Sequence, residues 1–127
     1  IRYKLDNINI ITNKMETNEK QEIWLRAMGT SWHGNEFLAT VQELKQVFGE
    51  PDEVGTEDDK VQYEWILDLE ISNSLGTSAV ITIYDWKEYR KYSEDEFIKF
   101  HIGGHSGNIT ELAQIEIENV LNLYRND

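Results

Sequence analysis

The sequence contains no cysteine, and this absence excludes several kinds of chemistry at once. Disulfides, thiolate nucleophiles and cysteine-based zinc sites are all ruled out across the 127 residues. A chain without cysteine is also typical of a reducing compartment, so we expect a cytoplasmic protein.

Proline, glycine and long apolar runs are scarce as well. One proline, eight glycines and an apolar share of 39% are typical of a folded chain rather than a disordered one. No apolar run approaches the roughly 20 residues that a membrane helix needs, and no apolar stretch of a signal peptide follows the first charged residues. We therefore expect a single domain over residues 1–127 with no membrane partner.

Basic residues are few beside the acidic ones. Twelve lysines and arginines face 24 aspartates and glutamates, which gives a net charge of −12. Nucleic-acid-binding proteins usually carry the opposite sign, because their cations displace counterions from phosphates. Direct, extended nucleic-acid binding is therefore disfavoured and a basic partner is favoured. A simpler interpretation, that the charge only maintains solubility, stays open.

Apolar residues alternate with polar ones in several short stretches. This period of two predicts strands over residues 8–11, 61–69, 79–86 and 97–102. Residues 21–28 alternate loosely and also favour a strand, although residues 16–28 fit a helix too. A glycine at each end of residues 29–34 predicts a loop there.

Two segments have the spacing of amphipathic helices. Thr40 and Glu43 form a capping box before a helix over 41–48, which Gly49 and Pro51 end. A second helix is predicted over 109–125, with Asn108 as its N-cap. The expected fold is α+β, an antiparallel sheet of about four to five strands with two helices packed on one face. Two apolar residues of the second helix lie outside its main stripe and suggest a further contact, such as a homodimer (Ile115 and Leu123).

The three histidines are the best candidates for catalysis or metal binding. His101 and His105 are four residues apart, as in helical zinc pairs, but Gly103 and Gly104 between them argue against a helix. A loop could still bring both to one ion, with His33 or a carboxylate as third ligand. The alternative is that they bond to the backbone. Neither a nucleophile elbow nor a phosphate-binding glycine motif is present, so we predict a non-enzymatic protein without metal or cofactor.

Two segments combine residue types that bind partners or ligands. Aromatic and basic residues interleave at the end of a predicted strand, as at protein interfaces and nucleotide sites (Tyr84, Trp86, Lys87, Arg90, Lys91). A glycine-rich turn precedes the last helix, where backbone N–H groups favour an anion (His101, Gly103, Gly104, His105, Ser106). The loop at 29–34 adds further candidates (Thr30, Ser31, Trp32, His33). Six acids within residues 50–59 fit either a solvated loop or a surface that mimics nucleic acid.

Five short segments occur in an order typical of one protein family. They are GTSWHG at 29–34, FGEP at 48–51, EW at 64–65, TIYDWK at 82–87 and HIGG at 101–104. In this the chain resembles a family of small phage and prophage proteins, mostly of unassigned function. It departs from that pattern in a long hairpin at 72–78 and in Phe100, where relatives often carry tryptophan.

The resemblance implies a class of role rather than a catalytic residue. Small acidic phage proteins often inhibit host defence, as anti-CRISPR proteins do, and such a protein would act in the host cytoplasm. One hypothesis is therefore occlusion of a basic groove in a CRISPR effector or nuclease. The alternatives are a protein that sequesters a small anionic nucleotide, such as a cyclic nucleotide or an ADP-ribose derivative, and a hydrolase of such signals that uses His101 and His105.

Overall fold

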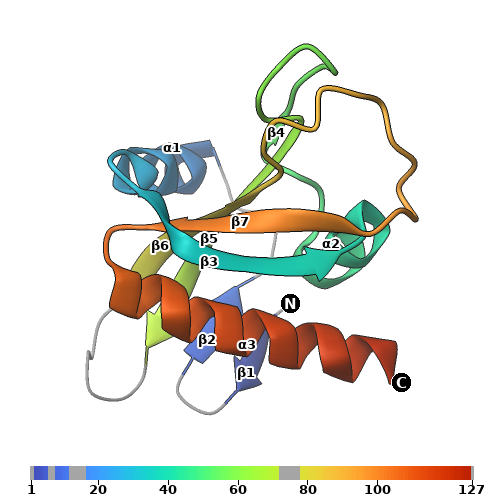
Figure 1. The fold of residues 1–127 in the computed structure, drawn as a ribbon. Helices are drawn as coiled ribbons and strands as arrows, with labels where there is room; N and C mark the ends of the chain where they lie inside the picture. The colour runs from blue at the N-terminus through green and yellow to red at the C-terminus, as the bar shows by residue number, and fades with distance from the viewer. Residues whose placement is uncertain (1, 6–7, 12–16, 72–77, 127) are drawn as a thin grey trace.

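The computed structural model describes residues 2–5, 8–11, 17–71 and 78–126. Within these residues seven strands join one sheet, and three helices accompany it (Figure 1). All six strand pairs are antiparallel. The predicted α+β class with an antiparallel sheet is confirmed.

The sheet has the strand order β1-β2-β5-β6-β7-β3, and the short β4 pairs with the beginning of β5. The strands are β1 (Arg2–Leu5), β2 (Ile8–Ile11), β3 (Ser31–Ala39), β4 (Glu53–Val54), β5 (Tyr63–Ile71), β6 (Ser78–Tyr84) and β7 (Ile98–Gly104). The four strands predicted from clear alternation correspond to β2, β5, β6 and β7. The long hairpin between β5 and β6 falls mostly on residues 72–77, outside the described residues.

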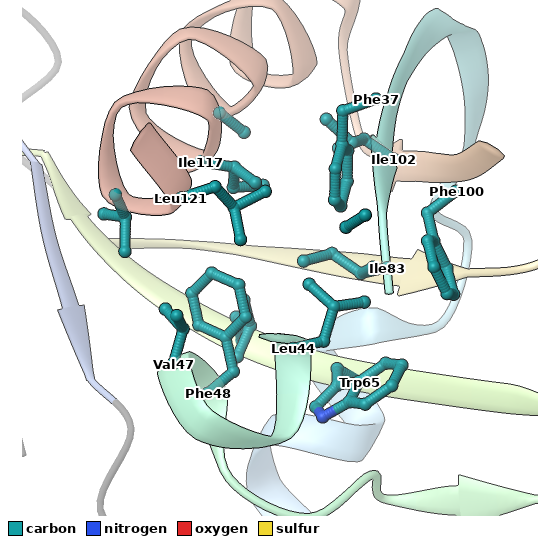
Figure 2. Close-up of a cluster of buried hydrophobic side chains, with 14 of the residues drawn as sticks. Phe37, Leu44, Val47, Phe48, Trp65, Ile83, Phe100, Ile102, Ile117 and Leu121 are labelled. Carbon is teal, nitrogen blue, oxygen red and sulfur yellow. The ribbon is translucent and has the colours of Figure 1, made fainter. Parts of the chain in front are cut away.

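One face of the sheet forms the hydrophobic core together with α2 (Val41–Phe48) and α3 (Gly107–Arg125). Trp65 and Ile83 come from the sheet, Leu44 comes from α2 and Ile117 comes from α3, and all are buried in one cluster (Figure 2). The clean period of two in β5 arises because every second side chain enters this core.

The two core helices begin at different kinds of cap. At α2 the predicted capping box is present, since Thr40 Oγ1 accepts from Glu43 N at 3.0 Å and Glu43 Oε1 accepts from Thr40 N at 2.9 Å. The predicted N-cap of the last helix, Asn108, is wrong. Ser106 has the extended backbone of a cap and accepts from Ile109 N, so α3 begins at Gly107.

The segment predicted as a strand at 21–28 is instead part of helix α1 (Thr17–Ala27), so the helical alternative is the right one. Ile23 is buried while its neighbours Trp24 and Leu25 are exposed, which is a helical distribution. Arg26 joins the helix to Asp68 of β5 through an ion pair of 3.2 Å. Because Asp68 points away from the core, α1 lies on the opposite side of the sheet from α3 (Figure 1).

The loop predicted for residues 29–34 is also wrong from Ser31 onward. Strand β3 begins at Ser31 and pairs with β7 at the edge of the sheet. Its register shifts between Trp32 and Glu36, and Gly34 has a φ of +96° within this β-bulge. Glycine marks a bulge in a strand here rather than the end of a loop.

Candidate functional site

Four ring-bearing side chains meet on the side of the sheet that faces away from α2 and α3. We call Trp32, Tyr84, Trp86 and His101 the aromatic face. Tyr84 pairs with His101 across β6 and β7, and the alternating neighbours Ile83 and Ile102 point into the core. The faces of two paired strands thus bring together residues far apart in the sequence.

His101 occupies the centre of the aromatic face. Its ring stacks on Trp32 at a centroid distance of 4.8 Å and an interplanar angle of 14°. Trp86 lies at 6.3 Å and 28°, and Tyr84 meets the imidazole edge-on at 5.5 Å. The His101 side chain is only 13% exposed, whereas Trp32 is 48% and Trp86 40% exposed. Exposed tryptophans packed around a largely covered side chain are typical of interaction surfaces.

The β3 bulge positions the outer part of the aromatic face. Trp32 donates from its indole Nε1 to the carbonyl of Asn35 at 3.2 Å, inside the bulge. Asn35 is held in turn by Gln114 and Thr110 of α3, at 2.8 and 2.6 Å. Past the bulge, a carboxylate oxygen of Glu36 lies 3.1 Å from His101 Nε2. The bulge therefore brings an indole and a carboxylate to the same imidazole.

Replacing Gly34 with alanine is expected to lower the free energy of unfolding by about 1–2 kcal/mol, because a Cβ disfavours positive φ. No atom lies within 4 Å of the added Cβ, so crowding does not contribute. Urea unfolding measures the loss. The matched control is Gly107→Ala in the first turn of α3, where helix propensity predicts a gain of about 0.5–1 kcal/mol. If Gly34→Ala and Gly107→Ala changed the free energy of unfolding equally, the β-bulge would not require glycine at position 34.

The turn that carries Trp86 is anchored by a buried carboxylate. Asp85 is 0% exposed and accepts from the backbone N–H groups of Gln62 and Tyr63, at 2.7 and 3.0 Å. Its second oxygen accepts from the Tyr92 hydroxyl at 2.8 Å. Burial and the nearby Asp85 raise the pKa of Tyr92, which keeps the phenol protonated as a donor. Asp85 thereby connects Tyr92 to the residues where β5 begins.

Two residues of this turn have unusual backbone angles for side chains with a Cβ. Lys87 has a φ of 56° and Tyr89 a φ of 51°. Such positions are strained by about 1 kcal/mol or more and persist only where surrounding contacts enforce them. A bond of 2.7 Å from Lys87 N to the Lys60 carbonyl is one such contact. Strained but well-held turns cluster at binding sites, and this one presents Trp86 and Tyr89 to solvent.

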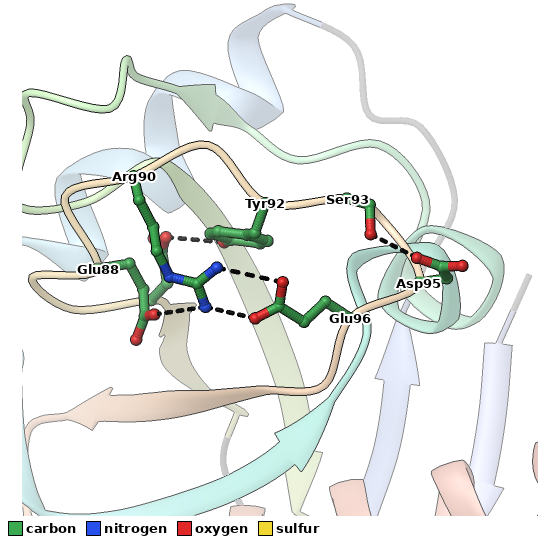
Figure 3. A network of polar contacts seen from close by, with 7 residues as sticks. Glu88, Arg90, Tyr92, Ser93, Asp95 and Glu96 are labelled. Carbon is green, nitrogen blue, oxygen red and sulfur yellow. Dashed lines mark hydrogen bonds and ion pairs between the residues drawn. The ribbon is translucent and has the colours of Figure 1, made fainter.

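The basic residues predicted for binding do not form one cluster, as the aromatic residues do. Arg90 contacts both Glu96 and Glu88, and its guanidinium lies 5.6 Å from the Tyr92 ring (Figure 3). Lys87 Nζ lies 5.5 Å from the Trp86 ring. Lys91 is exposed. The predicted aromatic and basic cluster is therefore only partly formed, because Arg90 is engaged within its own loop.

The three histidines take three separate partners. His33 Nε2 lies 3.0 Å from the Gly104 carbonyl, and His105 Nε2 lies 2.7 Å from the Arg26 carbonyl. His101 instead contacts Glu36. Among the described residues, no three histidines, aspartates or glutamates are grouped so as to hold a metal ion. The alternative in which histidines bond to the backbone thus describes His33 and His105.

The glycine-rich turn before α3 is explained by packing. An added Cβ at Gly103 would collide with Thr82 Oγ1, and one at Gly104 would come within 2.7 Å of Thr110 Cγ2. Both residues belong to β7, and neither has a positive φ. Ser106 caps α3, Ser31 Oγ lies 3.4 Å from His33 Nε2, and Thr30 bonds to the Ala27 carbonyl. These contacts account for the predicted anion-binding residues without a ligand.

The acidic segment at 50–59 is held by several contacts, and some of them connect it to β5. Asp52 accepts from Ile66 N at 2.7 Å, and Glu53 pairs directly with Glu64 across β4 and β5. Burial, together with Glu53 and Asp52, raises the pKa of Glu64. Glu64 is also the cross-strand neighbour of Tyr84 in the aromatic face, and its charge contributes, after burial, to the raised pKa of that phenol. Carboxylates therefore border the aromatic face through Glu36 and Glu64.

Replacing Glu64 with glutamine is expected to stabilise the protein at pH 7 by about 0.2–1 kcal/mol, because like charges directly opposite across strands repel. When folding raises the pKa of a carboxyl, the protein loses stability as the pH increases through the titration of that carboxyl. The gain should therefore vanish below the ordinary glutamate pKa of about 4.3. Thermal melts from pH 3 to pH 8 measure it, with exposed Glu57→Gln as control. If Glu64→Gln were less stable than the wild type at pH 7, the repulsion between Glu64 and Glu53 would be refuted.

The structure thus brings four of the predicted site residues into one cluster, namely those of the aromatic face. Sequence reasoning assigned no role to Glu36 or Asp85, and it interpreted Gly34 as the end of a loop rather than as part of a bulge. Asp85 had a visible signal, since it directly follows a buried strand and carboxylates at strand ends often anchor loops. Glu36 had none, because its contact depends on an unpredicted bulge.

Comparisons with known proteins add no relative. No family model, no curated protein and no solved structure matches the chain. Within the described residues, no helix combines the length and apolar character that crossing a bilayer requires.

Proposed function

We propose that this protein is a non-enzymatic inhibitor that binds a positively charged surface of another protein, such as the nucleic-acid groove of a nuclease or CRISPR effector. The observation that carries the proposal is the aromatic face, which exposes two tryptophans on an acidic domain. The role in counter-defence rests on the resemblance to phage proteins.

Charge and ring exposure support this function together. A net charge of −12 repels nucleic acid and attracts the basic grooves that bind it. Indole rings contribute binding energy through desolvation, and interface hot spots are enriched in tryptophan, tyrosine and arginine. An acidic domain with exposed indoles therefore has one feature for steering a basic partner and another for holding it.

The structure favours this function over sequestration of a nucleotide. A phosphate needs free cations or free backbone N–H groups. Of the predicted cations, Arg90 is paired with two glutamates, which leaves Lys87 and Lys91 for a phosphate. Side chains crowd Gly103 and Gly104. Thermal shifts against cyclic dinucleotides and ADP-ribose derivatives test the alternative. A bound ligand at 100 times its dissociation constant would add about 2.7 kcal/mol.

Affinity capture from defence-bearing bacterial cells tests the proposed function. The baits are the wild-type protein, the face variant Trp32→Ser/Trp86→Ser, and the control Trp24→Ser/Leu123→Ser, whose residues are exposed elsewhere. We expect the wild type and the control to capture a nucleic-acid-binding protein that added DNA or RNA releases, and the face variant to lose it. Salt raised to several hundred millimolar should weaken capture. Capture that is insensitive to salt, or equal for all baits, would refute the proposal.

A further inference from the structure

We infer that the aromatic face is a receptor for an arginine side chain of the partner, whose guanidinium stacks on Trp32 and bonds to Glu36. The inference rests on the proposed function, since it names the chemistry that the partner presents to the same site. Three features of the face support it: an open indole, a carboxylate beside it, and a cation already on a neighbouring ring.

The open indole is that of Trp32. One side of the ring stacks on His101 at 4.8 Å, yet the residue remains 48% exposed. The bond from Nε1 to the Asn35 carbonyl fixes the ring, so little side-chain freedom is lost on binding. Tryptophan is the best aromatic acceptor for a cation, and planar guanidinium also stacks on it.

The carboxylate is that of Glu36. Its Oε2 lies 3.1 Å from His101 Nε2, and the Glu36 side chain is 31% exposed. Trp32 and Glu36 both belong to the edge strand β3, and both contact the His101 imidazole. A guanidinium offers five N–H donors in a plane and can stack and donate at once, whereas an ammonium is a compact, strongly hydrated point charge.

The cation beside the neighbouring Trp86 ring shows that the aromatic face can accommodate a positive charge. Lys87 Nζ lies 5.5 Å from the Trp86 ring centroid. Lys87 and the exposed Lys99 of β7 also limit the number of further positive charges that the face can accept. One arginine beside Glu36, at the Trp32 end, fits this distribution better than a run of cations.

The experiment titrates the protein with two peptides that differ only in their cations, one with arginines in a Gly/Ser background and one with lysines. Indole ¹H–¹⁵N resonances report the four tryptophans separately. We expect the Trp32 indole to shift with the arginine peptide, which should bind several-fold more tightly than the lysine peptide. Trp32→Leu should weaken its binding about threefold to thirtyfold, the range of a cation–π contact.

Matched variants distinguish binding at Trp32 and Glu36 from general electrostatic attraction to an acidic protein. Glu36→Gln should weaken binding of the arginine peptide several-fold. Glu111→Gln on the exposed side of α3 and Trp24→Leu on α1 should change that binding less than twofold. Thermal melts confirm that each variant is folded. Equal binding of the two peptides, equal effects of Trp32→Leu and Trp24→Leu, or no binding of the arginine peptide would each overturn the arginine site. The proposed function stands after any of these results if the captured partner still requires the aromatic face, and it fails separately if capture does not.

Discussion

Replacing Asp85 with alanine is expected to lower the free energy of unfolding by about 3–5 kcal/mol, as when one partner of a buried polar network is removed. Two backbone N–H groups and the Tyr92 hydroxyl would lose their acceptor, in a buried position for Gln62 and in part-buried positions for Tyr63 and Tyr92. Urea unfolding at pH 7 measures the loss. For a domain of this size it corresponds to a fall of about 10–20 °C in Tm.

Two milder variants separate the bonds of Asp85. Tyr92→Phe removes only the hydroxyl donor and should destabilise by about 1–2 kcal/mol, since one hydrogen bond to a charged group is lost. Asp85→Asn keeps the size of the side chain and should lie between the other two variants. If Asp85→Ala were no more destabilising than Tyr92→Phe, the turn would not depend on the carboxylate.

The second large effect is expected where α2 meets the end of α3. Arg125 donates to both carboxylate oxygens of Glu43 and, at 3.0 Å, to the Leu38 carbonyl. Glu43 is buried and belongs to the capping box. Arg125→Ala should therefore destabilise the protein by about 2 kcal/mol at pH 7, because the capping carboxylate loses its charged partner.

The pH dependence of this pair has a definite sign. The Arg125 guanidinium lowers the pKa of Glu43 below its ordinary value. A carboxyl with a lowered folded pKa contributes stability above its unfolded pKa of about 4.3, and this contribution is lost as the pH falls through the folded pKa. The gap between wild type and Arg125→Ala should thus be full at pH 7 and shrink towards pH 3.

The control for this pair is Arg90→Ala, which removes an exposed ion pair and should change Tm less. A gap between wild type and Arg125→Ala that stays constant from pH 7 to pH 3 would show that Arg125 acts through packing on Phe97 rather than through Glu43.

Elements with one buried face could be predicted from the sequence. Strand β5 and helix α2 have buried and exposed sides that follow the period of two and the helical period, and the capping box marks where α2 begins. Helix α1 could not be separated from a strand, because between residues 21 and 27 only Ile23 is buried, and Trp24 and Leu25 face solvent. Its contact with Asp68 is a tertiary effect that no local pattern contains.

The candidate site was only partly predictable for a related reason. Tyr84 and Trp86 were recognised from their composition, but their meeting with Trp32 depends on the pairing of β3 with β7 and on the Gly34 bulge. Glycine suggested a loop at 29–34 and an anion site at 103–104. In the structure it serves a bulge in one case and close packing in the other.

Stability and the proposed binding role make opposing demands on the residues that border the aromatic face. The strained turn at Lys87 and Tyr89 and the paired carboxylates of Glu53 and Glu64 lower stability, and both border the aromatic face. Binding sites often retain such features because preorganisation and charge serve recognition.

Site-specific photocrosslinking inside bacterial cells tests most directly whether the partner lies on the aromatic face. A benzophenone amino acid would replace Trp86 or Tyr89 in the strained turn, and Leu123 or Tyr124 on the exposed side of α3. We predict a crosslink to a basic nucleic-acid-binding protein from the two turn positions and none from α3. Crosslinks that form only from α3 would show that the partner binds the opposite side of the sheet, which would contradict a binding role for the aromatic face.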